Sequence, residues 1–141
     1  MSRMNELIAI LKQDYARFPH QQTFAIYDPQ VIFRDPMSRL RGRSQFEGMI
    51  RWMGQWFQEL RLQLHEIYSQ GAVIHTRWTM SWVAPLPWKP RLQVTGRSQL
   101  WVNEQGLIAA QTDYWDCSRW QLFLQLWRFP RQTPTADPGP R

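Results

Sequence analysis

The apolar side chains of this chain change their spacing once, near Leu60, and that change limits which elements the chain can form. Before Leu60, apolar residues recur at the spacing of helices that bury one face. After it, every second residue is apolar in runs over 62–64, 74–82 and 92–102, and a further run covers 107–115. Turn residues separate these runs, so the spacing predicts a meander of four long antiparallel strands.

The residues before Leu60 predict two helices with a short strand between them. The first helix covers 4–18 and ends at Pro19, which cannot continue a helix. Thr23 is placed to cap a single turn. A strand is predicted over 31–36, because β-branched and aromatic residues open it and a residue before proline is extended.

The second helix is predicted to run from Ser44 to about Leu60. Ser44 and Glu47 have the spacing of a capping box, in which each side chain bonds the other residue's backbone amide. The expected buried stripe of this helix consists of Phe46, Met49, Ile50, Met53, Trp56, Phe57 and Leu60. A last apolar segment over 120–129 fits a short helix, although its alternating leucines also permit a strand.

This order of elements predicts an α+β fold, a conical roll in which a strongly curved antiparallel sheet wraps around the N-terminal helices. At 141 residues, the chain has the length of one domain. We expect that domain to cover residues 1–129. Residues 130–141 read PRQTPTADPGPR, which is rich in proline and has no apolar periodicity, so this tail is predicted to be disordered.

Composition restricts the classes of protein to which the chain can belong. It has no apolar stretch of the length that a membrane span needs, no signal peptide and a single cysteine, Cys117, which together favour a cytoplasmic location. The net charge of +6 is carried mainly by arginine. Nucleic-acid binding is disfavoured, because most aromatic residues are expected to face inward rather than to stack on exposed bases.

The strand register decides which side chains face the interior, since a slip of one residue turns every side chain over. A continuous apolar face pairs Leu64 with Trp78, Trp78 with Gly96, and Gly96 with Asp113. The small residues at 96 and 98 are expected to leave room between two tryptophans, with Asp113 pointing into it. The predicted inner face carries Trp78, Gly96, Ser98, Gln111, Asp113 and Trp115.

Two aspartates are the candidate chemical groups. Asp35 shares one side of its strand with Val31 and Phe33, so it is expected to point inward like Asp113. A carboxyl group in an apolar, tryptophan-lined site has a raised pKa, which suits a general base. The structural alternative is that Asp35 caps the turn at Pro36, or that either aspartate pairs with an arginine.

The segments YDPQVIFRDP and LRG, followed near the end by TDYWD, carry a family resemblance. With the order of elements, they resemble the nuclear-transport-factor-two-like superfamily, which includes polyketide cyclases, SnoaL-like proteins and ketosteroid isomerase. The short segments resemble an uncharacterised cyanobacterial and plastid branch. The resemblance covers residues 4–129. It implies a pocket between the sheet and the helices, and often a homodimer formed through the outer face of the sheet.

Three functions follow as hypotheses. The first is a domain that binds a small hydrophobic molecule in an aromatic pocket. The second is an isomerase, dehydratase or cyclase with Asp113 as general base, which requires an inward proton donor nearby. The third is a dimeric scaffold or a module at a membrane surface. The residues expected to line the pocket are Asp35, Trp78, Gly96, Ser98, Gln111, Asp113 and Trp115.

The remaining polar clusters predict neither a metal nor a cofactor. The register places His65 and His75 on the outer face, and no spacing of cysteines or carboxylates completes a metal site. Arginines at 39, 41 and 43 could hold a phosphate, but a solvated loop is favoured. Trp120, Phe123 and Trp127 lie at helical spacing between arginines. These residues could bind an anionic membrane, but the favoured interpretation is that they pack inward and close the open end of the cone.

Overall fold

A computed structural model describes residues 2–127 of the chain. Three α-helices and six strands follow one another, with a 3-10 turn over Phe24–Ile26 before the first strand. The helices are α1 (Arg3–Ala16), α2 (Arg43–Trp56) and α3 (Arg119–Gln125). The strands are β1 (Tyr27–Arg34), β2 (Arg39–Arg41), β3 (Gln58–Gln70), β4 (Val73–Val83), β5 (Arg91–Val102) and β6 (Ile108–Trp115).

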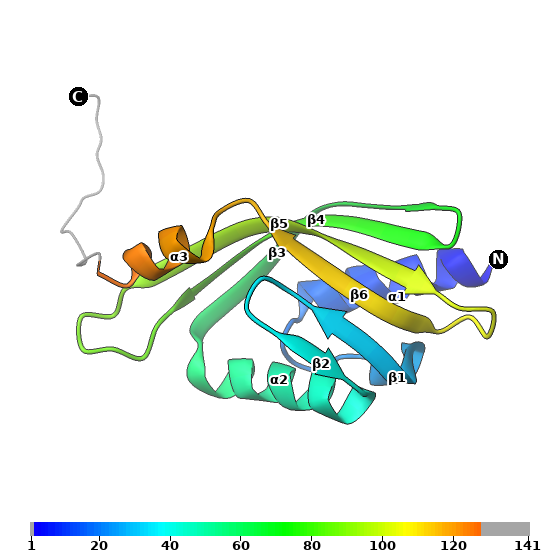
Figure 1. Cartoon of the computed structure of the whole chain (residues 1–141), viewed down its shortest axis with the longest axis horizontal. Coiled ribbons are helices and arrows are strands. Elements are labelled where there is room, and N and C mark those ends of the chain that lie inside the picture. Colours follow the sequence, from blue (N-terminus) through cyan, green and yellow to red (C-terminus); the bar gives the residue numbers. More distant parts are fainter. Residues whose placement is uncertain (1, 128–141) are drawn as a thin grey trace.

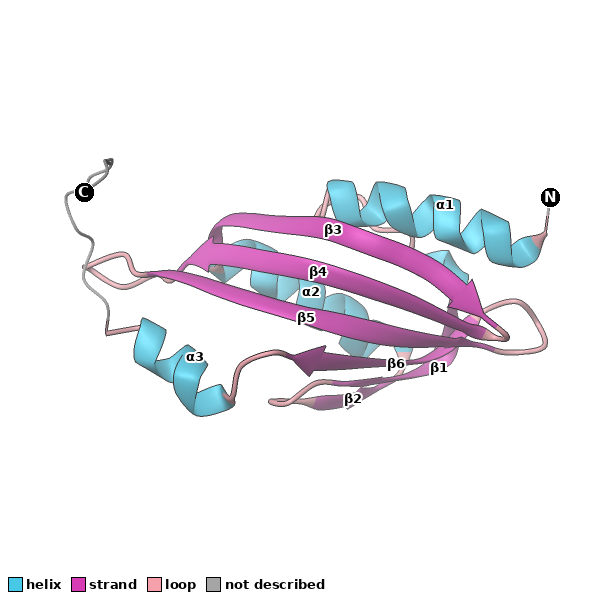
Figure 2. Cartoon of the chain, turned by 90° about the horizontal axis from the view of Figure 1, so that it is seen from above, coloured by secondary structure: helices cyan, strands magenta, loops and turns pink. Residues whose placement is uncertain are grey.

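The six strands form one open, curved sheet in the order β2-β1-β6-β5-β4-β3. The predicted meander is confirmed, because β3, β4, β5 and β6 pair in sequence as antiparallel neighbours. The sheet is mixed rather than wholly antiparallel, since β1 runs parallel to β6. Helices α1 and α2 lie on one face of the sheet, as the two views show (Figures 1 and 2). The predicted α+β cone is therefore confirmed.

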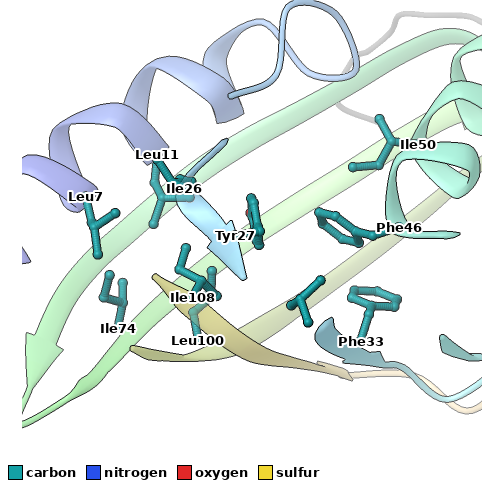
Figure 3. Close-up of a cluster of buried hydrophobic side chains, with 11 residues drawn as sticks. Leu7, Leu11, Ile26, Tyr27, Phe33, Phe46, Ile50, Ile74, Leu100 and Ile108 are labelled. Carbon is teal, nitrogen blue, oxygen red and sulfur yellow. The ribbon is translucent and has the colours of Figure 1, made fainter. Parts of the chain in front are cut away.

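The main core lies where α1 and α2 meet the sheet. Phe46 of α2 is its aromatic centre, and its ring centroid lies 4.8 Å from that of Tyr27 and 5.5 Å from that of Phe33. Figure 3 shows the side chains that the helices and strands contribute to this cluster. Its buried members are Leu7, Leu11, Ile26, Tyr27, Val31, Phe33, Phe46, Ile50, Ile74, Leu100 and Ile108.

A second cluster lies at the opposite end of the long strands. It is built around two buried tryptophans of β4, Trp78 and Trp82. Phe57, just after α2, stacks on Trp82 with 4.6 Å between ring centroids. Leu122 and Leu126 of the α3 segment pack against the same cluster. The sheet is thus covered at one end by α1 and α2, and at the other by Phe57 and α3.

The predicted register holds between β3, β4 and β5. Leu64 pairs with Trp78, and Trp78 pairs with Gly96. The predicted pairing of β5 with β6 is wrong by two residues, because Gly96 pairs with Trp115 and Ser98 pairs with Asp113. An irregularity at Trp101 and Val102 shifts the strands. A shift of two residues keeps every side chain on its predicted face.

The predicted start of α2 is wrong. The helix begins at Arg43 behind Gly42, whose φ of 95° places it in the left-handed region, and no side chain caps it. Oε1 of Gln45 instead accepts a hydrogen bond from the backbone of Arg41. The helix ends at Trp56 rather than Leu60, because the backbone is already extended at Phe57.

Two smaller predictions near the N-terminus need correction. The single turn after Thr23 exists, but the Thr23 hydroxyl does not cap it. That hydroxyl donates to Asp14 instead, at 2.9 Å. The first strand, predicted over 31–36, extends from Tyr27 to Arg34.

The last apolar segment forms α3, but with the opposite face inward from the one predicted. The stripe of Trp120, Phe123 and Trp127 is exposed, and the leucines at 122 and 126 pack inward. Within residues 2–127, every helix is too short or too polar to cross a membrane. The tail predicted to be disordered lies outside the described residues.

Candidate functional site

Asp113 of β6 lies on the inner face of the sheet and is partly buried. Two side chains donate hydrogen bonds to it, Oγ of Ser98 at 2.6 Å and Nε2 of Gln111 at 3.1 Å. Both bonds end on Oδ1. No residue of the described part of the chain donates to Oδ2, so the carboxyl group is held by one oxygen and offers the other.

The indole of Trp78 fixes the direction of the shorter bond. Nε1 of Trp78 donates to Oγ of Ser98 at 2.8 Å, and both residues are buried. An indole N–H can only donate, so the Ser98 oxygen accepts from Trp78 and its own proton is directed to Asp113. Trp78, Ser98 and Asp113 therefore form a chain of hydrogen bonds with one orientation.

The open room predicted beside Gly96 is filled by the ring of Trp78. A Cβ atom at Gly96 would lie 3.0 Å from that ring and would collide with the carbonyl oxygen of Tyr114. Glycine is thus required here by the close approach of the tryptophan and of the neighbouring strand. A hollow of about 230 Å³ lies instead on the opposite face of the sheet, lined by Ile32, Arg34, Trp101, Ala110 and Thr112.

Tyr15, in the last turn of α1, is a site residue that the sequence did not identify. Its side chain packs against both apolar clusters, and its hydroxyl lies 3.1 Å from Oγ1 of Thr76. Burial raises the pKa of Tyr15 above its ordinary value, and the negative charge of Asp113 raises it further. The hydroxyl therefore stays protonated as a donor. Its signal in the sequence was a tyrosine on an apolar helix face, where a phenol needs a partner.

Burial raises the pKa of Asp113 to about 6. The hydrogen bonds from Ser98 and Gln111 lower the pKa and so limit the rise, while the negative charge of Asp35 adds to it. The carboxyl group is therefore mainly ionised at pH 7, yet it takes a proton far more readily than a solvated aspartate.

Asp35 caps a turn, which is the structural alternative that the sequence left open. Its Oδ1 accepts from the backbone amides of Met37 at 2.8 Å and Ser38 at 2.6 Å, so it caps the turn between β1 and β2. Its negative charge also raises the pKa of Asp113, though less than burial does. Asp35 is thus a neighbouring charge held in place by a turn.

Gln111 and Trp115 complete the predicted set. The amide of Gln111 donates to Asp113, while its buried Oε1 accepts no hydrogen bond from the described residues. Trp115 lies opposite Gly96 and packs against the second cluster. All the predicted inner-face residues from 78 to 115 are thus brought together on one face.

The other polar candidates lie away from this site. Nε2 of His65 lies 2.7 Å from Oγ1 of Thr79, and His75 stacks on Tyr68, both on the outer face as predicted. Arg39 and Arg41 lie in β2, and the buried Nε of Arg43 donates no hydrogen bond to the described residues. Between residues 2 and 127, no three His, Cys, Asp or Glu side chains are grouped to hold a metal ion.

The sequence of the chain matches one known protein family. Residues 5–111 match the model of a family described as uncharacterized conserved protein, DUF2358. The chain belongs to this family. No curated protein matches the sequence.

Solved structures share the fold of this DUF2358 protein. A protein from Shewanella putrefaciens assigned as a SnoaL-like polyketide cyclase is 14% identical, with a TM-score of 0.69 over 90% of this chain and 98% of that chain. A hypothetical protein from Catenulispora acidiphila with a ketosteroid isomerase-like fold, crystallised with trimethylamine, is 13% identical, with a TM-score of 0.68 over 85% and 91%. An epoxide hydrolase of M. tuberculosis, described as LEH-like, is 22% identical, with a TM-score of 0.60 over 87% and 84%.

These similarities confirm the fold expected from the sequence. The open sheet with three helices is the NTF2-like cone, a fold that occurs in cyclase-, isomerase- and epoxide hydrolase-like proteins. At such low identity they establish the fold alone, and one fold carries many activities. The cyanobacterial and plastid branch, the cytoplasmic location and the homodimer stay predictions.

Proposed function

We propose that this chain binds a small, largely apolar molecule at Asp113. The observation that carries the proposal is the arrangement of its carboxyl group, with both donors on Oδ1 and Oδ2 left to accept from a ligand. Carboxyl groups that are desolvated without a compensating cation are concentrated at functional sites. The proposed ligand contacts are the partly exposed Asp113 and Trp115, with Ser98 and Gln111 holding Asp113 from behind.

The chemistry of the site defines the ligand class. Oδ2 of Asp113 is an acceptor, so the ligand presents a hydroxyl or a protonated amine. Trp78 and Trp115 supply apolar and aromatic surface, which also favours a cationic amine. The Catenulispora protein with trimethylamine is a case of an apolar amine held on this fold. Since Trp78 fills the space at Gly96, the ligand enters beside the partly buried Asp113 and Trp115.

Catalysis is the second candidate, and Tyr15 favours it. The isomerase, dehydratase or cyclase hypothesis required a proton donor near Asp113. The hydroxyl of Tyr15 is the candidate donor, because it lies 3.1 Å from Oγ1 of Thr76, and Thr76 pairs with Ser98, which donates to Asp113. An ionised Asp113 would take a proton next to a carbonyl group, and Tyr15 would stabilise the resulting oxyanion.

Native mass spectrometry of the full chain tests the binding proposal. We expect a bound mass on the wild type that is lost in Asp113→Asn and kept in Asp116→Asn, an exposed aspartate three residues further on. For a ligand that dissociates during purification, trimethylamine serves as a probe, followed by quenching of tryptophan fluorescence. The proposal fails if the two variants bind the copurified mass and the probe equally.

Proton exchange tests the catalytic candidate separately. We expect the wild type to exchange the α-protons of a small unsaturated ketone into heavy water, at a rate that rises as pH increases through about 6. Tyr15→Phe should slow the exchange, and Asp113→Asn should abolish it. Binding without any exchange would leave the chain a binding protein and remove the catalytic candidate.

A further inference from the structure

The outward face of α3 is an apolar surface that the Asp113 site does not use. Its four large side chains are exposed at 64% for Trp120, 43% for Phe123, 48% for Leu124 and 54% for Trp127. We call these four residues the α3 aromatic face. A soluble protein rarely exposes a continuous apolar patch without a partner for it.

The α3 aromatic face is continuous. The ring centroids of Trp120 and Phe123 lie 5.4 Å apart, and those of Phe123 and Trp127 lie 6.0 Å apart. Trp127 in turn stacks on Trp88 of the loop between β4 and β5, at 5.6 Å. One aromatic surface therefore extends from the start of α3 to the end of the β4–β5 hairpin, at the end of the molecule opposite the N-terminus (Figure 2).

The helix is held firmly by its other face, so this exposure is not the result of fraying. Ser118 and Gln121 form a capping box at its start. The side-chain amide of Gln125 bonds the backbone of Gln93 twice, accepting from N at 2.8 Å and donating to O at 3.1 Å. It thereby pairs with the edge of β5 beyond the end of β6. The aromatic face is presented outward on a fixed support.

The same end of the molecule exposes two tryptophans of α2. Trp52 and Trp56 are 53% and 47% exposed. Trp52 packs edge-on against Phe57, and Phe57 stacks on Trp82 of the cluster that α3 covers. This chain of contacts connects the exposed Trp52 of α2 to the cluster that supports α3.

The charges at this end are mainly positive. Arg119 precedes Trp120, Lys89 follows Trp88, and Arg51 precedes Trp52, and all three cations are exposed. Asp116 is an exposed acid nearby in the sequence, while Glu59 is paired with Arg91. Cations beside exposed tryptophans favour a partner that has an apolar interior and a negatively charged surface.

We propose that the α3 aromatic face docks the protein on the surface of an anionic lipid bilayer. Tryptophan is the side chain most suited to the boundary between headgroups and acyl chains, and neighbouring Arg and Lys meet the lipid phosphates. A second copy of the chain fits less well, because a two-fold contact would bring the same cations together. The Asp113 site is formed by other residues, so lipid docking is independent of the proposed ligand.

Vesicle flotation with the full chain tests the proposal. The wild type is expected to float with vesicles of phosphatidylcholine and phosphatidylglycerol, less with phosphatidylcholine alone, and less as salt increases. In the double variant Trp120→Ser and Phe123→Ser, binding should fall about tenfold or more. The matched control is Trp101→Ser, which removes an exposed tryptophan from the outer face of the sheet.

Three results would overturn the proposal. One is a wild type that floats with neither kind of vesicle. Another is a double variant that floats as well as the control, provided circular dichroism shows both to be folded. The third is a wild type that light scattering shows to be an oligomer without lipid and that the double variant makes monomeric, because the aromatic face would then join two copies.

Discussion

Asp14 near the end of α1 and Asp113 on β6 are both carboxyl groups in the interior, and they are held in opposite ways. Asp14 is 2% exposed and uses both oxygens. Oδ2 accepts from the backbone of Thr23 at 2.9 Å, and Oδ1 accepts from the Thr23 hydroxyl at 2.9 Å and from Arg17 at 3.4 Å. Within residues 2–127, Asp113 accepts on Oδ1 only and forms no ion pair with an arginine.

The difference separates a structural carboxylate from a candidate functional one. Asp14 is saturated by donors and a cation, so it has no capacity left for a ligand, and it fastens the loop around Thr23 to α1. Asp113 keeps a free oxygen and a raised pKa, at a cost in stability. Sites that accept such a cost are concentrated where a protein binds or reacts.

The largest change in stability is expected when Asp14, whose two oxygens both accept hydrogen bonds, is replaced. Asp14→Ala leaves the partly buried amide and hydroxyl of Thr23 without an acceptor, so we expect a loss of about 3 kcal/mol in the free energy of unfolding. Urea unfolding measures it, with Asp116→Ala as the exposed control that should change little. A loss below about 1 kcal/mol would contradict a structural role for Asp14.

At Asp113, in contrast to Asp14, a substitution is expected to increase the free energy of unfolding. Because folding raises the pKa of Asp113 to about 6, its ionisation costs stability increasingly as pH rises from about 4 to 6, and the cost is constant above pH 6. Asp113→Asn cannot ionise, and it still accepts from Ser98 and Gln111. We therefore expect the variant to be more stable than the wild type at pH 8, by about 2 kcal/mol, and to lose this advantage at pH 4.

Urea unfolding at several pH values measures this difference. Asp116→Asn is the control, since substituting an exposed aspartate should give no stability difference that depends on pH. If Asp113→Asn were less stable than the wild type at pH 8, the carboxylate would be structural after all. A stability difference that did not depend on pH would equally contradict the raised pKa.

A smaller effect is expected at Ser98, which orients Asp113. Ser98→Ala removes a donor that lowers the pKa of Asp113, so that pKa should rise above about 6. It also leaves Nε1 of buried Trp78 without its acceptor, at a cost of about 2 kcal/mol. Titration of the Asp113 carboxyl carbon by NMR measures the pKa, and Ser81→Ala on the outer face is the control. An unchanged pKa would mean that the bond to Ser98 does not hold the charge.

The alternation of apolar residues was enough to predict which side of the sheet each site residue faces. That prediction survived a register error of two residues between β5 and β6, because side chains repeat their direction every second residue. The pairing itself was not predictable from alternation. It depends on the loop after β5, where Oδ1 of Asn103 accepts from the backbone of Gln105 and Leu107.

Features that depend on three-dimensional packing were missed. The room at Gly96 was inferred from side-chain size alone, whereas the ring of Trp78 occupies it. Tyr15 was assigned to the apolar face of α1, and its approach to Thr76 joins residues 61 positions apart. α3 is apolar on two faces, so its periodicity did not decide which face packs inward. In each case the deciding contact comes from an element distant in the sequence.

The smallest expected effect is at Asp35, and it tests whether the two predicted carboxylates act on each other. Asp35→Asn removes a negative charge but keeps Oδ1 as an acceptor for Met37 and Ser38, so the turn and the stability should change by no more than about 0.5 kcal/mol. The pKa of Asp113 should nevertheless fall, since the charge of Asp35 raises it. NMR titration of Asp113 measures this, with Asp28→Asn as a control at the other end of β1. A fall confined to Asp35→Asn would make Asp35 an electrostatic partner of the site, and an unchanged pKa would leave it a turn cap only.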